Sequence, residues 1–434
     1  KWNLRFPTLA EALDLKEDSM ADVDLEILSD SLLAEADTVS VIPTDSLIQQ
    51  DTLATQDSVP QKPQPVIPEV NVVHTDSRAC LAAFYAALDS ASSKPVRVVH
   101  YGDSQIEEDR ITNILREKWQ KQYGGGGVGL IPLHQTIPTR TIRQKLAING
   151  VVQTTQKGPK RYIVYGPKSM RLTDSDDYGV MGQVAVMDSN LVPGSDSVVL
   201  HVEPLDKKRK PHNYFNRVRI LADSSLTFSL SPLADSTTHC DIVLQGTGNV
   251  YGVSLETPIG VIVDNIPMRG CSGNIFTKID SVQLSDFYRE TNTRLIILQF
   301  GGNMIPQTAN PSTISGYVRS TLRQQVRYLR ACAPEASILF IGPSDMSTRI
   351  DGEMVTYPLV PYMDRLLKKM AEEEQIAYWS MYDAMGGQNS MVKWVEIGWA
   401  GSDYVHFTRA GANKVGRLLY DWLMAYPDSL NTKH

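Results

Sequence analysis

The sequence predicts a three-layer α/β fold with an all-β module set into it. Two patterns carry this prediction: strands alternate with amphipathic helices in residues 76–140 and 256–434, whereas residues 141–255 hold short alternating strands. Strands that alternate with helices form parallel sheets covered by helices on both faces. Short strands separated by Gly, Asp, Asn and Pro turns are typical of a β-sandwich or jelly roll. We therefore expect one α/β domain, in two segments, interrupted by a jelly-roll-like β-sandwich.

Residues 1–75 differ in composition from the rest of the chain. An acidic first part precedes a Ser/Thr/Gln/Pro-rich run that ends in SVPQKPQPVIPEV. The first part predicts one or two amphipathic helices and the second an extended linker, although the composition fits a disordered spacer equally well. Because the sequence opens on Lys1 rather than Met, we expect that a signal peptide or N-terminal anchor has been removed from an exported protein of the periplasm or cell envelope.

The α/β elements follow one another in order from residue 96. A buried-type strand at 96–101 precedes a helix whose apolar face holds Ile111, Leu115 and Trp119. The same alternation continues with strands at 294–300, 337–341 and near 376–381, and with helices at 314–329, 361–375 and 409–426.

Charge and cysteine content exclude several classes of partner. The net charge of −7 argues against a nucleic-acid or anionic-membrane partner, because phosphate groups need a clustered positive field. No apolar run reaches the ~18 residues that would cross a bilayer, so we expect no membrane span. The four cysteines show no Cys-x-x-Cys spacing, which indicates neither a zinc site nor a redox pair and leaves the redox compartment open.

Ser104 stands directly after the first strand, in the Gly-Asp-Ser of residues 102–104. In an open parallel sheet the active crevice lies at the carboxyl ends of the strands. A serine at the start of the next helix presents its hydroxyl to that crevice, and its backbone N–H can point at a developing oxyanion. The alternative is a serine that only caps the helix. Ser104 is the candidate nucleophile.

Asp403 and His406 form the candidate base, in GSDYVHFTRAG near the C-terminus. A nucleophilic serine needs a base, and the base needs an orienting carboxylate. The spacing of three residues lets one loop present both side chains, so that the carboxylate fixes the imidazole tautomer. The alternative is a surface aspartate beside a structural histidine.

Gly273 and Asn303 lie in two glycine-containing loops. Asn303 follows the strand 294–300, and its side-chain amide can donate to an oxyanion. Gly273 can turn its backbone N–H toward the same point without a Cβ in the way. Each loop by itself also fits a plain glycine turn. Together with the N–H of Ser104, these groups predict an oxyanion hole.

In chain order, Ser104, Gly273, Asn303 and the Asp-x-x-His of residues 403–406 match the four sequence blocks of the SGNH, or GDSL-type, hydrolases. The resemblance covers the α/β segments. The stretches GDSQIEEDRIT, LREKWQKQYGGGGVGLIP and DYVHFTRAG also resemble the peptidoglycan O-acetylesterases of Gram-negative bacteria. Those enzymes carry a carbohydrate-binding-like β module between the first and second blocks, which is where residues 141–255 lie.

The resemblance implies a flavodoxin-like α/β/α domain and a serine esterase that removes O-acetyl groups from a cell-envelope polysaccharide, with O-acetylated muramic acid of peptidoglycan favoured. Ser104, Asp403 and His406 would be catalytic, and the oxyanion hole would use Ser104, Gly273 and Asn303. No metal or organic cofactor is implied, and the oligomeric state is open. The alternatives are an esterase, lipase or acetyltransferase acting on another acyl substrate, and a sugar-binding envelope protein without activity.

Other residues near the blocks have plainer interpretations. The acids of residues 107–109 could hold a metal, but acids in a first helical turn are favoured by the helix dipole, so a solvated face is expected. Cys271 is expected to be an inert thiol. Trp394 and Trp399 could stack on a sugar ring or pack in the core. Gln105 departs from the His or Leu that relatives often carry, which bears on substrate rather than on the reaction.

Overall fold

The computed structural model describes residues 67–72, 76–149, 151–152, 158–172, 177–188, 197–206, 208, 210–234 and 237–425. The predicted acidic segment and the linker up to residue 66 lie outside the described residues. At the start of the described part, Ile67 and Val70 pack against the apolar core on one face of the α/β sheet. No helix in these ranges is both long and apolar enough to cross a bilayer.

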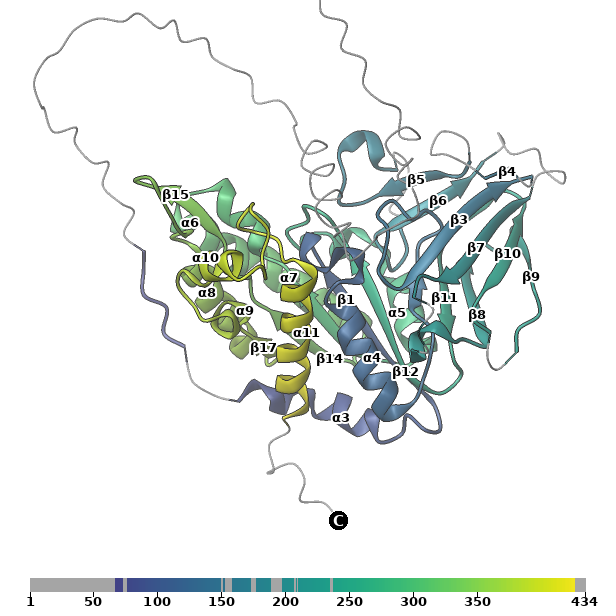
Figure 1. Cartoon of the computed structure of the whole chain (residues 1–434), viewed down its shortest axis with the longest axis horizontal. Helices are drawn as coiled ribbons and strands as arrows, with labels where there is room; N and C mark the ends of the chain where they lie inside the picture. Colours follow the sequence, from purple (N-terminus) through teal and green to yellow (C-terminus); the bar gives the residue numbers. More distant parts are fainter. Residues whose placement is uncertain are drawn as a thin grey trace, which may run out of the picture. The chain divides into compact units, whose positions relative to one another are not determined.

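A parallel five-stranded sheet forms the centre of the α/β part (Figure 1). Its strands, in spatial order, are β12 (Gly260–Pro267), β1 (Pro95–Gly102), β13 (Thr293–Gln299), β14 (Ser337–Ile341) and β17 (Ala377–Trp379). Counted along the chain, this is the order 2-1-3-4-5 of the flavodoxin-like sheet, whose connections reverse direction between the first and third strands. The predicted flavodoxin-like arrangement is the one observed, and the reversal lies between β1 and β13.

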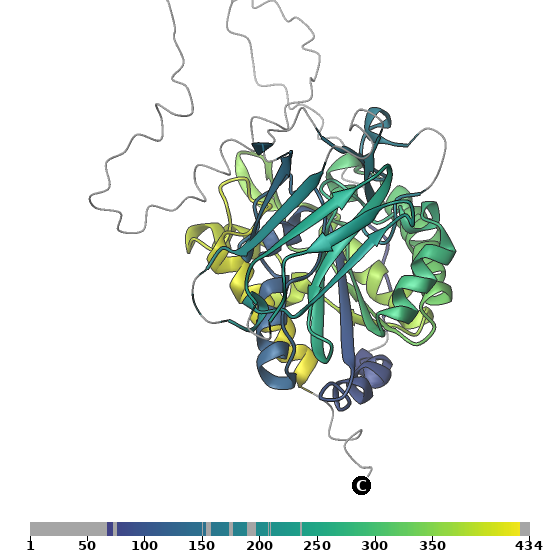
Figure 2. The same ribbon diagram turned by 90° about the vertical axis from the view of Figure 1, so that its right-hand side faces the viewer.

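Helices cover both faces of this sheet. Neighbouring strand residues point to opposite sides, and because they are apolar on both sides, both faces have to be buried. Val98 belongs to the apolar cluster on one face and Val99 to the cluster on the other. In Figure 2, α4 and α11 lie on one side of the sheet and α6 and α7 on the other. The helices are α3 (Ala82–Leu88), α4 (Thr112–Tyr123), α5 (Ser281–Glu290), α6 (Pro311–Gly316), α7 (Arg323–Cys332), α8 (Val360–Glu373), α9 (Met381–Met385), α10 (Ser390–Glu396) and α11 (Arg409–Met424).

Two predicted helices differ in detail from the observed ones. The helix expected over 314–329 consists of α6, a π-helical turn, η7 (Tyr317–Leu322), and α7. The helix expected directly after Ser104 begins only at Thr112, with α4. Between them lies the short 3₁₀ segment η2 (Ser104–Asp109), which is kinked because Glu107 is extended and Glu108 has a positive φ of 58°.

Strands between residues 129 and 256 build two further five-stranded antiparallel sheets. One holds β4 (Val151–Val152), β3 (Ile142–Ile148), β7 (Val198–Pro204), β10 (Cys240–Gln245) and β9 (Thr227–Leu230); the other holds β2 (Gly129–Ile131), β11 (Gly248–Glu256), β6 (Gln183–Met187), β5 (Lys160–Ile163) and β8 (Arg217–Ala222). Side chains from both sheets share one apolar cluster. We call this part the β region. Strand β2 precedes residue 141 yet pairs with β11; the boundaries 141–255 of a separate domain stay a prediction.

The chain leaves and re-enters the α/β part at one point lined by glycines. The backbone N–H of Val261, at the start of β12, donates to the carbonyl of Gly124, which ends α4, over 2.9 Å. Gly125 and Gly260 both have positive φ, at 108° and 86°, and a Cβ on either would meet the backbone of the opposite segment. Glycine is required here by the close approach of the two segments.

A buried ion cluster joins the β region to the central sheet. Arg97 of β1 donates to both carboxylate oxygens of Asp264 on β12, over 2.6 and 2.8 Å, and also pairs with Glu256 at the end of β11. All three side chains are fully buried. A buried arginine with two carboxylates is stable only while each charge keeps its partner, so this cluster fixes how β11 meets the sheet.

Candidate active site

Ser104 and His406 are in hydrogen-bond contact, although 302 residues separate them: Ser104 Oγ lies 2.8 Å from His406 Nε2. Ser104 follows β1 immediately, after Gly102 and Asp103. Gly102 allows a tight turn, because a Cβ there would lie 3.0 Å from the Ile106 side chain. The Asp103 carboxylate accepts the N–H of Gln105 over 3.0 Å and so begins η2. The turn is fixed by the residues on both sides of the serine.

Asp403 orients His406 through the loop between α10 and α11. Its Oδ2 lies 2.7 Å from His406 Nδ1, and its Oδ1 accepts the backbone N–H groups of Val405 and His406 over 2.9 and 3.0 Å. Burial alone would raise the pKa of Asp403, but the hydrogen bond and charge of His406 hold that pKa below its usual value. An ionised carboxylate on Nδ1 keeps the proton there and leaves Nε2 free to accept from Ser104. The structure brings the three predicted side chains into one hydrogen-bonded row.

The Gln105 side chain ties the serine loop to the histidine loop. Its amide nitrogen donates to the carbonyl of Val405 over 2.7 Å and lies 3.4 Å from Ser344 Oγ. From the sequence we noted Gln105 only as a departure from relatives, because nothing local to residue 105 indicates a contact 300 residues away. Its position directly after the serine is the one signal that could have found it.

Gly273 and Asn303 lie in two loops that contact each other. Gly273 has a φ of 87°, and a Cβ there would lie 2.9 Å from that of Phe300, so the glycine allows its loop to pack on the end of β13. The amide nitrogen of Asn303 donates to Asp103 Oδ2 and to the carbonyl of Cys271, each over 3.1 Å. Asn303 therefore contacts the residue before Ser104 and the loop that carries Gly273.

Asp103 carries a buried carboxylate next to the candidate nucleophile. Burial raises its pKa to about 6, although the backbone N–H of Gln105 and the charge of His406 act in the opposite direction. One oxygen accepts from Gln105 and the other from Asn303. Protonation would turn one of these oxygens into an O–H donor and so disturb its contact with Gln105 or Asn303.

The prediction of a solvated helix face at residues 107–109 was wrong. Glu107 and Asp109 are 3% exposed, and each of the three acids pairs with arginine. The pairs are Glu107 with Arg269, Glu108 with Arg110 and Arg140, and Asp109 with Arg116. The segment is kinked rather than helical, so its side chains do not follow the helical spacing on which the prediction depended. In the described part of the chain, no three His, Cys, Asp or Glu side chains gather as a metal site requires.

The tryptophans before Asp403 pack in the core. Trp394 is 5% exposed, and its Nε1 donates to the carbonyl of Met385 over 3.1 Å. Trp399 is partly buried and meets it edge-on, with ring centroids 5.2 Å apart. Of the two interpretations left open for this pair, the core interpretation is the one observed.

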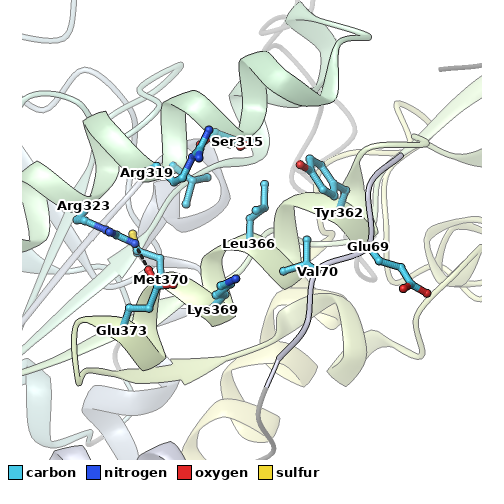
Figure 3. Close-up of a pocket in the computed structure, with 11 residues that line it drawn as sticks. Glu69, Val70, Ser315, Arg319, Arg323, Tyr362, Leu366, Lys369, Met370 and Glu373 are labelled. Carbon is cyan, nitrogen blue, oxygen red and sulfur yellow. Dashed lines mark hydrogen bonds and ion pairs between the residues drawn. The ribbon is translucent and has the colours of Figure 1, made fainter. Parts of the chain in front are cut away.

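A cavity of about 400 Å³ lies away from these residues, between η7, α7 and α8 (Figure 3). Arg319, Leu366 and Lys369 are among its lining residues, and Glu69 and Val70 lie across it. None of the predicted site residues lines it.

Comparison with known proteins agrees with the fold. Residues 235–414 match the GDSL-like Lipase/Acylhydrolase family, a span that includes Gly273, Asn303, Asp403 and His406. The structure of a peptidoglycan O-acetylesterase is similar, with a TM-score of 0.61 and 20% identity, over 83% of this chain and 99% of that one. An acetylxylan esterase from Geobacillus stearothermophilus is similar over 38% of this chain and 73% of its own, with 17% identity and a TM-score of 0.29. No curated protein sequence matches the chain.

The fold and the family match support an SGNH-type hydrolase, as the four blocks indicated. The match of residues 235–414 to a GDSL-like acylhydrolase family supports a carboxylic ester hydrolase.

Proposed function

We propose that this hydrolase is a serine esterase that removes O-acetyl groups from a cell-envelope polysaccharide, with O-acetylated muramic acid of peptidoglycan as the favoured substrate. The observation that carries the proposal is the hydrogen-bonded row Ser104–His406–Asp403 at the carboxyl edge of the sheet. The similar fold of a peptidoglycan O-acetylesterase supports the substrate, because the match extends over 83% of this chain and therefore beyond the α/β segments. We further propose that the protein is exported and that residues 141–255 are the inserted β module.

The first half of the reaction forms an acetyl-enzyme. His406 Nε2 takes the proton of Ser104 Oγ while that oxygen attacks the acetyl carbonyl carbon. The carbonyl oxygen becomes an oxyanion, stabilised by the backbone N–H groups of Ser104 and Gly273 and the side-chain amide of Asn303. The bond from the carbon to the sugar oxygen then breaks, and His406 gives its proton to that oxygen.

The second half releases acetate. Water loses a proton to His406 and attacks the acetyl carbon, and the same donors stabilise the second oxyanion. When the bond to Ser104 Oγ breaks, His406 returns the proton to the serine. Asp403 stays ionised throughout and stabilises the imidazolium that forms in each half. These residues suffice for the chemistry described.

Acetate release from O-acetylated peptidoglycan, acetylated xylan and a chromogenic acetyl ester tests the proposal. Ser104→Ala should lower release from peptidoglycan by several orders of magnitude, since a triad serine is required for the covalent step. Ser320→Ala, an exposed serine on η7, is the matched control and should leave the rate unchanged. Release from the small ester alone would contradict the substrate, and full activity of Ser104→Ala would contradict the mechanism.

A further inference from the structure

Cys271 accepts hydrogen bonds from both groups that we assign to the oxyanion hole besides Ser104. Its Sγ accepts the backbone N–H of Gly273 over 3.3 Å, and its carbonyl oxygen accepts the amide of Asn303 over 3.1 Å. The two donors come from loops 30 residues apart in sequence, after β12 and β13. One residue therefore sets the spacing between them.

The sulfur differs from an oxygen acceptor in strength. Burial raises the pKa of the Cys271 thiol to about 11, which keeps it neutral in ordinary buffers. A neutral thiol is a weak acceptor, whereas hydrogen bonds to an ionised oxygen are roughly twice as strong as neutral ones. The sulfur thus orients the N–H of Gly273 in the free enzyme. The N–H then forms a stronger hydrogen bond when a substrate oxyanion replaces the sulfur as its acceptor.

Neighbouring contacts hold the rest of this loop. The Tyr317 hydroxyl donates to the carbonyl of Ser272 over 2.8 Å, and Gly273 packs on Phe300. These contacts fix the backbone on either side of the N–H but do not bond to it. The Cys271 side chain, 3% exposed, supplies that bond.

We propose that Cys271 is a positioning residue of the oxyanion hole: its sulfur orients the N–H of Gly273 and its carbonyl orients the amide of Asn303, and both donors pass to the substrate oxygen as negative charge develops. The proposal depends on the proposed function, because it assumes that these two donors serve the reaction. It gives Cys271 no contact with substrate.

Three substitutions separate hydrogen bonding from packing. Cys271→Ser keeps an acceptor, Cys271→Val keeps the apolar volume, and Cys271→Ala keeps neither. If the sulfur orients the donor, kcat on the chromogenic ester should fall about tenfold below wild type in the Val and Ala variants. In the Ser variant kcat should stay within about threefold of wild type, and KM should stay within about twofold of wild type in all three. If the residue only packs, Val should be the most active variant and Ser the least, because a buried hydroxyl is costly.

The rate at which an organophosphonate modifies Ser104 gives a second measurement, because its phosphoryl oxygen also becomes an oxyanion. We expect Cys271→Ser to be modified faster than Cys271→Val and Cys271→Ala. Cys240→Val, a control in the β region, should change neither kcat nor the rate of modification. Equal rates in all variants, or Val above Ser, would overturn the proposal. A fully active Ser104→Ala enzyme would instead overturn the proposed function, whereas a fully active Asn303→Ala enzyme would overturn only the role of Asn303 as a donor, so the two failures are distinguishable.

Discussion

Replacing Asp403 by asparagine should slow the reaction without disturbing the loop. The asparagine side-chain oxygen can still accept the two backbone N–H groups that Asp403 Oδ1 accepts from Val405 and His406. Its NH₂ group would then face His406 Nδ1, which favours the tautomer with the proton on Nε2. That tautomer cannot accept the proton of Ser104, and the imidazolium loses its neighbouring charge.

The magnitude follows from the geometry of this ion pair. At the observed 2.7 Å between Asp403 Oδ2 and His406 Nδ1, Coulomb attraction is about 1.5 kcal/mol in bulk water and about 6 kcal/mol at the effective dielectric constant of a protein surface. The two side chains are 50% and 39% exposed, so an intermediate value applies. About 3 to 4 kcal/mol corresponds to a fall in kcat of roughly 10²- to 10³-fold.

The assay is kcat and KM on a chromogenic acetyl ester at a pH where wild-type activity is on its plateau, with a thermal unfolding curve for each protein. Asp286→Asn, on the exposed face of α5, is the matched control and should match wild type. KM should change little, because Asp403 acts through the base. A kcat for Asp403→Asn within threefold of wild type would refute the assignment of His406 as an oriented base.

Three further predictions concern neighbouring features. Burial raises the pKa of Asp103 to about 6, above the usual 3.8, so its ionisation costs the folded state stability as pH rises from 3.8 to about 6. Asp103→Asn has no carboxyl group to ionise there, so its stability in urea should gain on wild type over that pH range; parallel curves of stability against pH would contradict this. Gly273→Ala should lower kcat about tenfold with little change in KM. At a φ of 87°, the added Cβ would press on Phe300 and strain the loop by about 1 to 3 kcal/mol. A kcat equal to that of wild type would contradict this. Arg97→Met should lower the free energy of unfolding in urea by about 3 to 5 kcal/mol, because the buried Asp264 carboxylate loses its arginine and Glu256 keeps only Arg217 and Arg219. A loss below about 1 kcal/mol would show that the cluster is not needed.

Four strands of the central sheet (β1, β13, β14 and β17) and the row of candidate catalytic residues could be predicted because they depend on local patterns, whereas β12 was not among the predicted strands. Strand β14 is buried at every position and apolar after its first residue, Ser337, as parallel strands between two helix layers are. Ser104 and Asn303 directly follow strands that turned out to be neighbours, β1 and β13. The position of each residue after a strand was enough to place both at one edge of the sheet.

The rest depends on contacts between distant residues, which no local pattern reveals. Glu107 was placed on a solvated face because nothing near it in sequence shows that Arg269 would meet it. Gln105 bonds to a carbonyl 300 residues away, and Arg97 meets acids more than 150 residues away. Each contact exists only once the loops have been brought together by the sheet.

The glycine-lined crossing between α4 and β12 has a consequence for how such chains diversify. Because the segment that leaves after Gly124 touches the one that returns before Val261, the α/β part closes on itself whatever length of chain runs between them. Lengthening, shortening or exchanging the intervening strands changes no distance that the central sheet has to span. Strands of the β region other than β11, which carries Glu256 of the buried cluster, can therefore be remodelled while the ends of α4 and β12 stay together.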